Sequence, residues 1–204
     1  MSFYAFCRFF TRLWAPMAYR VQYQGTENIP QRGGYILVSN HRSMADPVVI
    51  ANRLDQQLFF MAKEELFQNP IAGWVLRHLG AFPVERGKGD TGAVEWAIDL
   101  LRQGDVLAMF PEGTRSTTQE PLRPKSGAAF IARATKADIL PCCVVLEDKA
   151  QAKGRPRLIV RYGKMIPFEE LGFSEEISPR ELKSATNFMW DRVLTLLEED
   201  RRED

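Results

Sequence analysis

Cysteine and histidine are scarce in this 204-residue sequence, and neither basic nor acidic residues are in clear excess. The three cysteines, Cys7, Cys142 and Cys143, are too few for a disulfide framework, and the adjacent pair lies in an apolar run, which predicts core thiols in a reducing compartment. The two histidines have no zinc-ligand spacing around them, so no metal site is expected. With 27 basic and 26 acidic residues the net charge is +1, which excludes the broad basic surface of a nucleic-acid-binding protein.

Long hydrophobic runs are missing as well. No apolar stretch reaches the roughly 18 residues of a membrane-spanning helix, and the N-terminus carries no cleavable signal. On a helix, however, the N-terminal segment places Arg8 and Arg12 opposite one broad apolar face. That face comprises Phe3, Phe6, Cys7, Phe9, Phe10, Leu13, Trp14 and Met17. We expect residues 1–20 to form a helix in a membrane interface, where its arginines would attract anionic lipid; the alternative is a helix docked on the protein's own core.

Segments with the patterns of strands and helices alternate along the rest of the chain. The predicted strands cover residues 19–23, 35–38, 58–61, 81–84, 106–110, 139–146 and 157–162. The predicted helices cover residues 47–54, 70–79, 91–101, 126–137 and 179–199. Such alternation predicts one α/β domain over residues 21–204, with a mixed central sheet flanked by helices.

The strongest chemical signal is the string Asn40-His41-Arg42-Ser43-Met44-Ala45-Asp46, which follows a predicted buried strand. Loops after the strands of α/β sheets commonly carry functional sites. If the carboxylate of Asp46 binds one imidazole nitrogen of His41, the other nitrogen can take a proton from a hydroxyl group. Asp46 also precedes Pro47, so it could cap the next helix, and the two roles can coexist. His78 lies on an amphipathic helix and is interpreted as structural.

A second string, Phe110-Pro111-Glu112-Gly113-Thr114-Arg115-Ser116, follows another predicted strand. Pro111 restricts the main-chain dihedral angles, and Gly113 permits angles that other residues rarely adopt. Both suit a loop that directs Glu112 and Arg115 inward. The basic residues that could join them are Arg86, Arg115 and Lys125. Two guanidinium groups and an ammonium group would suit a phosphate monoester. Taken singly, each of them is more typical of an exposed surface, and the string could be a turn with an incidental ion pair.

These strings resemble the glycerolipid acyltransferases typified by bacterial 1-acylglycerol-3-phosphate acyltransferase. The resemblance extends from Gly25 to Leu146 and keeps the family's order of four blocks. The blocks are Asn40 to Asp46, which matches a His-x4-Asp pattern, Phe82 to Arg86, Phe110 to Ser116, and Ile139 to Pro141. The fourth block departs from the family, because Cys142 and Cys143 stand where a second proline is often found.

The resemblance implies direct transfer of an acyl group from acyl-coenzyme A or acyl carrier protein to a lysophospholipid acceptor, without a covalent acyl-enzyme and without a cofactor. His41 would be the general base and Asp46 its partner, and Asn40 would support their loop. The implied substrate-binding residues are Lys63, Arg86, Glu112, Gly113, Arg115 and Lys125. Because substrate and product are lipids, the protein is expected to lie peripherally on the cytoplasmic face of a membrane.

Three other functions stay open at this point. An enzyme of the same family could acylate glycerol 3-phosphate or a different lysophospholipid. A non-catalytic lipid-binding module could keep the fold, although it would have no need of a proton acceptor at His41. A serine hydrolase could use Ser39 or Ser43 as its nucleophile, although the sequence lacks the Gly-x-Ser-x-Gly motif.

Overall fold

The computed structural model describes residues 3–85, 90–118, 120–147, 152–176 and 178–203. Its helices are α1 (Phe3–Ala18), α2 (Asp46–Ala51), α3 (Pro70–His78), α4 (Thr91–Arg102), α5 (Gly127–Thr135) and α6 (Pro179–Glu203). Its strands are β1 (Arg20–Gln24), β2 (Ile36–Ser39), β3 (Leu58–Lys63), β4 (Ala81–Val84), β5 (Val106–Met109), β6 (Ile139–Leu146) and β7 (Arg157–Tyr162). Short 3₁₀ helices lie between them at Thr26–Asn28, Glu64–Phe67 and Phe168–Leu171. The predicted α/β class is confirmed.

The described strands form one mixed sheet with the order β1-β7-β6-β2-β5-β3-β4. The strands from β6 to β4 in this order are parallel to one another, whereas β7 is antiparallel to β6 and carries β1 parallel to itself. The carboxyl ends of β2 and β5, which are neighbours, therefore lie at the same edge of the sheet. This edge brings together the two strings that the sequence singles out, because one follows β2 and the other follows β5.

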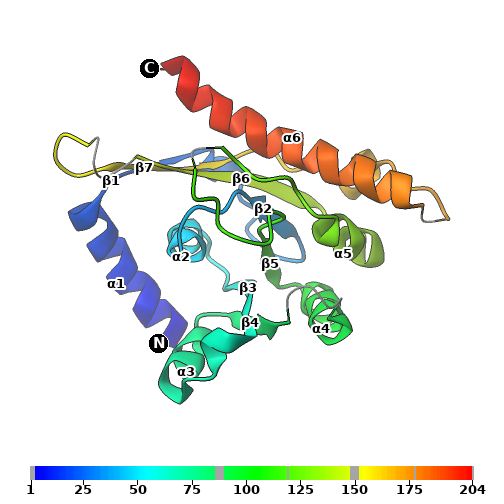
Figure 1. Ribbon diagram of the computed structural model, residues 1–204, viewed down its shortest axis with the longest axis horizontal. Helices are drawn as coiled ribbons and strands as arrows, with labels where there is room; N and C mark the ends of the chain where they lie inside the picture. The colour runs from blue at the N-terminus through cyan, green and yellow to red at the C-terminus, as the bar shows by residue number, and fades with distance from the viewer. Residues whose placement is uncertain (1–2, 86–89, 119, 148–151, 177, 204) are drawn as a thin grey trace.

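Helices cover both faces of the sheet. In Figure 1, α1 and α2 lie on one side, and α4, α5 and α6 lie on the other. The strand β2 is buried from both sides: Ile36 and Val38 belong to the core beneath α4, α5 and α6, and Leu37 belongs to the core beneath α2. The strand that leads into the first string is therefore held firmly at the centre of the molecule.

The N-terminal helix α1 is amphipathic, as predicted, but it docks on the protein through its polar side. The Arg8 guanidinium donates to the main-chain oxygen of Leu54, Arg12 Nε donates to that of Asn52 at 2.8 Å, and Thr11 Oγ1 donates to Asn52 Oδ1 at 2.7 Å. The large apolar side chains that face outward are Phe6, Phe9, Phe10, Leu13, Trp14 and Met17. These hydrogen bonds attach the helix to the protein, and the attraction of Arg8 and Arg12 to anionic lipid stays a prediction.

Two further findings concern helix length and the cysteines. Within the described residues, no helix has the length and apolar character needed to cross a bilayer. The helix predicted over residues 47–54 ends at Ala51, and the N–H groups of Asn52 and Leu54 form turns with the carbonyl oxygens of Val49 and Ala51 in place of further α-helical hydrogen bonds. Cys142 and Cys143 are fully buried free thiols in β6, so their predicted place in the core is confirmed.

Candidate active site

The loop between β2 and α2 is pinned to the neighbouring strand β6 by Asn40. The Asn40 Nδ2 donates to the main-chain oxygen of Val144 at 2.9 Å, and the main-chain N–H of Val144 donates to Asn40 Oδ1 at 2.8 Å. The side chain thus pairs with main chain as another strand would, and it is buried. This agrees with the supporting role expected for Asn40, because the loop begins directly after this attachment.

His41 and Asp46 lie in direct contact. The His41 Nδ1 is 2.9 Å from Asp46 Oδ2, and the same oxygen accepts the main-chain N–H groups of Arg42 at 2.7 Å and Ser43 at 2.8 Å. An ionised carboxylate is only an acceptor, so this contact places the imidazole proton on Nδ1. The other ring nitrogen, Nε2, is then the one that can accept a proton.

The alternative interpretation of Asp46 as a helix cap is not what the structure contains. Asp46 is itself the first residue of α2, and the N-cap position is Ala45, which has no side-chain cap. The carboxylate instead accepts hydrogen bonds from the loop that precedes the helix, and it is almost completely buried. Its position fixes both the main chain around His41 and the orientation of the imidazole ring.

Glu112 connects the two loops of the site. Its Oε1 accepts the main-chain N–H of His41 at 2.7 Å, and its Oε2 accepts that of Leu122 at 2.7 Å. The side chain is 3% exposed, and burial raises the pKa of Glu112 while the two N–H groups lower it. Both oxygens are therefore engaged with main chain, and a carboxylate would repel a phosphate. We reinterpret Glu112 as a positioning residue instead of the substrate contact expected from the sequence.

Sequence reasoning missed two contacts that hold His41, one to its ring and one to its main chain. The ring of Phe110 stacks on that of His41, with centroids 4.3 Å apart and an interplanar angle of 28°. The main-chain N–H of Ser116 donates to the carbonyl oxygen of His41 at 2.9 Å. Both partners belong to the second string, so the signal was present in the sequence. What could not be read from it was that the loop after β5 folds directly over His41.

A cavity of about 360 Å³ opens beside His41, and we call it the catalytic-edge cavity. Its apolar lining comprises Met61, Val84, Ala93, Val94, Ala108, Met109, Phe110 and Ala128. Polar groups also line it, namely His41, Glu85, Asp90 and Lys125. It lies on the face of the sheet that α4 and α5 cover, and its apolar walls suit an alkyl chain better than a polar ligand.

The basic residues expected at a phosphate are not all in one place. Lys125 lines the catalytic-edge cavity and packs over Gly113, which has a φ of +70° and where an added Cβ would lie 3.0 Å from Lys125 Nζ. Lys63 is half exposed, pairs with Glu65 at 2.7 Å, and is not among the described lining residues of the cavity. Arg115 is exposed on the loop after β5. Arg86 lies outside the described residues.

Three remaining predictions concern serine, histidine and metal. Ser39 is completely buried and its hydroxyl donates to the carbonyl oxygen of Asn40, and the Ser43 hydroxyl accepts the N–H of Ala45, so neither geometry resembles an activated nucleophile. His78 bonds through Nδ1 to the carbonyl oxygen of Trp74, four residues earlier in α3. Over the described ranges, no cluster of His, Cys, Asp and Glu could hold a metal ion.

Comparisons with known proteins show the family to which the chain belongs. A sequence model of the family described as Acyltransferase matches residues 20–145. The chain is 38% identical over 155 residues to a 1-acyl-sn-glycerol-3-phosphate acyltransferase of Streptococcus pneumoniae, which covers 73% of this chain and 56% of that protein. It is 29% identical over 197 residues to the enzyme of the same name from Bacillus subtilis, which covers 95% of this chain and 96% of that protein.

A solved structure is also similar. The crystal structure of the 1-acyl-sn-glycerophosphate acyltransferase from Thermotoga maritima superposes with a TM-score of 0.74 and 26% sequence identity. The superposition covers 96% of this chain and 79% of that one. The likeness therefore extends over nearly the whole fold described above.

Proposed function

This chain belongs to the acyltransferase family, and we propose that it transfers a fatty acyl group from an acyl thioester to the free hydroxyl of 1-acylglycerol 3-phosphate, giving phosphatidic acid. The observation that carries the proposal is the contact between His41 Nδ1 and the buried Asp46 carboxylate, at the mouth of an apolar cavity. The names of the similar proteins favour this acceptor over glycerol 3-phosphate and other lysophospholipids.

The proposed chemistry is a direct transfer. Nε2 of His41 takes the proton of the acceptor hydroxyl, and the oxygen attacks the carbonyl carbon of the thioester. The resulting tetrahedral intermediate collapses with cleavage of the carbon–sulfur bond, and the departing thiolate receives the proton from the imidazolium. The negative charge of Asp46 stabilises the imidazolium while the proton is held there. Such a base contributes roughly 10² to 10⁴ in rate, and no cofactor other than the donor is required.

Both substrates would reach the catalytic-edge cavity, which opens beside His41. The acyl chain of the donor, coenzyme A or acyl carrier protein, would lie in the catalytic-edge cavity, because that lining is largely apolar. The phosphate of the acceptor would be bound by Lys125, which lines the same cavity, with Arg115 and Arg86 as further cations. Lys63 is a weaker candidate, since its ammonium group already pairs with Glu65.

Membrane attachment would occur through α1. Its apolar face is exposed although the helix is firmly docked, and aromatic side chains such as Phe10 and Trp14 are typical of helices that lie in the bilayer interface. Residues 1–20 would thus be the interface segment and residues 21–204 the catalytic domain. The proposed location is peripheral, on the cytoplasmic face of a membrane, where lipid substrates can reach the site.

An assay with a panel of substrates tests the proposal. The purified full-length protein is offered isotope-labelled acyl-coenzyme A or acyl carrier protein with 1-acylglycerol 3-phosphate, glycerol 3-phosphate, lysophosphatidylcholine or no acceptor, and the products are resolved by mass. We expect labelled phosphatidic acid as the main product. Labelled free fatty acid without transfer would indicate a hydrolase, and turnover only with glycerol 3-phosphate would assign the chain to the other acceptor.

A further inference from the structure

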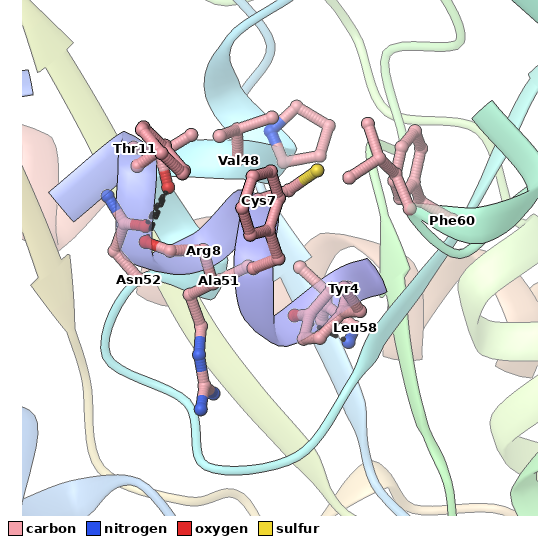
Figure 2. Close-up of a pocket in the computed structure, with 13 residues that line it drawn as sticks. Tyr4, Cys7, Arg8, Thr11, Val48, Ala51, Asn52, Leu58 and Phe60 are labelled. Carbon is pink, nitrogen blue, oxygen red and sulfur yellow. Dashed lines mark hydrogen bonds between the residues drawn. The ribbon is translucent and has the colours of Figure 1, made fainter. Parts of the chain in front are cut away.

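A second cavity, which we call the α1–α2 cavity, lies between α1, α2 and β3. It has a volume of about 290 Å³. Its apolar walls include Cys7, Phe10, Pro47, Val48, Leu58 and Phe60. Figure 2 shows the sulfur of Cys7 in the space between Val48 and Phe60. Among the polar lining residues, Thr11 and Asn52 bond to each other at 2.7 Å, and the Arg8 guanidinium donates to the main-chain oxygen of Leu54. The cavity therefore suits a ligand that is itself apolar.

The two cavities lie on opposite faces of the sheet, close to the same catalytic loop. Phe60 lines the α1–α2 cavity, and Met61, the next residue of β3, lines the catalytic-edge cavity. Pro47 and Val48, which form the wall on α2, directly follow Asp46 in the chain. An occupant of the α1–α2 cavity is thus separated from the His41–Asp46 pair by little more than the first turn of α2.

We propose that the α1–α2 cavity binds the acyl chain that the lysophospholipid acceptor already carries. The inference rests on the proposed function, in which one turnover brings together two alkyl chains, one on the donor and one on the acceptor. A methylene group occupies about as much volume as a water molecule, roughly 30 Å³, so each cavity accommodates roughly ten carbons, which is the greater part of one fatty chain, and neither accommodates two. Two chains therefore need two cavities.

The surface around the α1–α2 cavity indicates which chain it takes. Phe6 and Phe10 line it and are also about half exposed on the outward face of α1 that would lie in the bilayer. Met44, in the loop between His41 and Asp46, is 63% exposed and offers an apolar contact beside the site. The acceptor resides in the bilayer, whereas the donor is delivered from water. The acceptor's chain is therefore the one that first contacts the exposed apolar residues around this cavity.

Cys7 provides a native probe of occupancy. It lines the α1–α2 cavity, while Cys142 and Cys143 are fully buried in β6, so a small thiol reagent should label the folded protein at Cys7. Burial raises the pKa of Cys7, so labelling is best measured at alkaline pH, where more of the reactive thiolate forms. The variant Cys7→Ala is the matched control, because it removes the probe and keeps a small apolar side chain.

The binding test measures the rate at which N-ethylmaleimide labels Cys7 in full-length protein bound to phosphatidylcholine vesicles. We expect 1-palmitoylglycerol 3-phosphate in the vesicles to slow labelling about tenfold, as 90% occupancy would, and 1-butyrylglycerol 3-phosphate to leave the rate unchanged. Equal rates with and without the long-chain acceptor would overturn the proposal. Full protection by phosphatidylcholine alone would also overturn it, since the cavity would then hold bulk lipid.

The kinetic test fills the cavity after folding. Full-length protein is modified at Cys7 with decyl methanethiosulfonate or, as control, with methyl methanethiosulfonate. The decyl group should raise KM for the palmitoyl acceptor about tenfold or more, with no change in KM for the butyryl acceptor or the donor. Unchanged KM for the palmitoyl acceptor would contradict the proposal. Labelling does not require turnover, so protection of Cys7 in a protein without transferase activity would show that only the proposed function had failed.

Discussion

Replacing Asp46 by asparagine separates two ways in which a carboxylate can assist a histidine. In many catalytic pairs the amide turns its NH₂ group toward the imidazole and selects the wrong tautomer. Here Asp46 Oδ2 binds His41 Nδ1 and also the main-chain N–H groups of Arg42 and Ser43. If the asparagine amide turned its NH₂ group to this position, all three hydrogen bonds accepted there would be lost. We therefore expect the asparagine oxygen to stay in place and the tautomer to be preserved.

The magnitude follows from the charge alone. A hydrogen bond to a charged group contributes about 1.5–3 kcal/mol and a neutral one about 0.5–1.5 kcal/mol, so the imidazolium loses about 1–2 kcal/mol of stabilisation. Turnover of Asp46→Asn should then fall roughly five- to thirtyfold. The unfolding free energy should fall by about 1–3 kcal/mol, because the two loop N–H groups and the first turn of α2 also lose a negative partner.

Three measurements check this reasoning. Turnover is followed by release of the donor thiol, stability by thermal unfolding, and the tautomer of His41 by nitrogen chemical shifts in the imidazole ring. A loss of about 10⁴ in turnover, together with a proton on Nε2, would refute the argument from the shared oxygen. Wild-type turnover would refute the assignment of the His41–Asp46 pair itself.

Three further substitutions test the surroundings of the site. Glu112→Gln should lower kcat roughly ten- to hundredfold in steady-state assays, because an amide cannot accept both of the main-chain N–H groups that the carboxylate holds; unchanged kcat would deny its positioning role. Lys125→Ala should raise KM for 1-acylglycerol 3-phosphate far more than Lys63→Ala, and comparable effects would place the phosphate elsewhere. Changing Phe10 and Trp14 to serine should reduce sedimentation with vesicles and leave the melting temperature unchanged, whereas undiminished sedimentation would mean that the membrane contact lies outside α1.

Much of the fold could be predicted from local patterns. The strand at Ala81–Val84 and the strand at Ile139–Leu146 have the boundaries that their apolar runs indicate. The order of strands in the sheet could not be read from such patterns, because it depends on which buried faces meet after the chain has collapsed. Likewise α2 is shorter than predicted, and the carbonyl oxygens of Val49 and Ile50 near its end accept hydrogen bonds from the hydroxyl groups of Tyr23 and Tyr162, which lie far away in the sequence.

The same division holds for the site. The contact between His41 and Asp46 was predicted because only four residues separate them in the sequence. The role of Glu112 was not, because its partners, His41 and Leu122, are main-chain groups that show no residue preference in a sequence. The direction of α1 was also beyond sequence analysis: an amphipathic pattern identifies two faces, but the choice of which face docks depends on acceptors far away in the sequence, here the main-chain oxygens of Asn52 and Leu54.

The central claim is that His41 accepts the proton of the acceptor hydroxyl during direct acyl transfer. Its most direct test is the rate of phosphatidic acid formation by wild type and His41→Gln, at saturating donor and acceptor, together with the intact mass of the protein after donor is added without acceptor. We predict a loss of roughly 10² to 10⁴ in rate for the folded variant and an unchanged protein mass. A variant as fast as wild type, or a protein that gains the mass of an acyl group, would contradict the account.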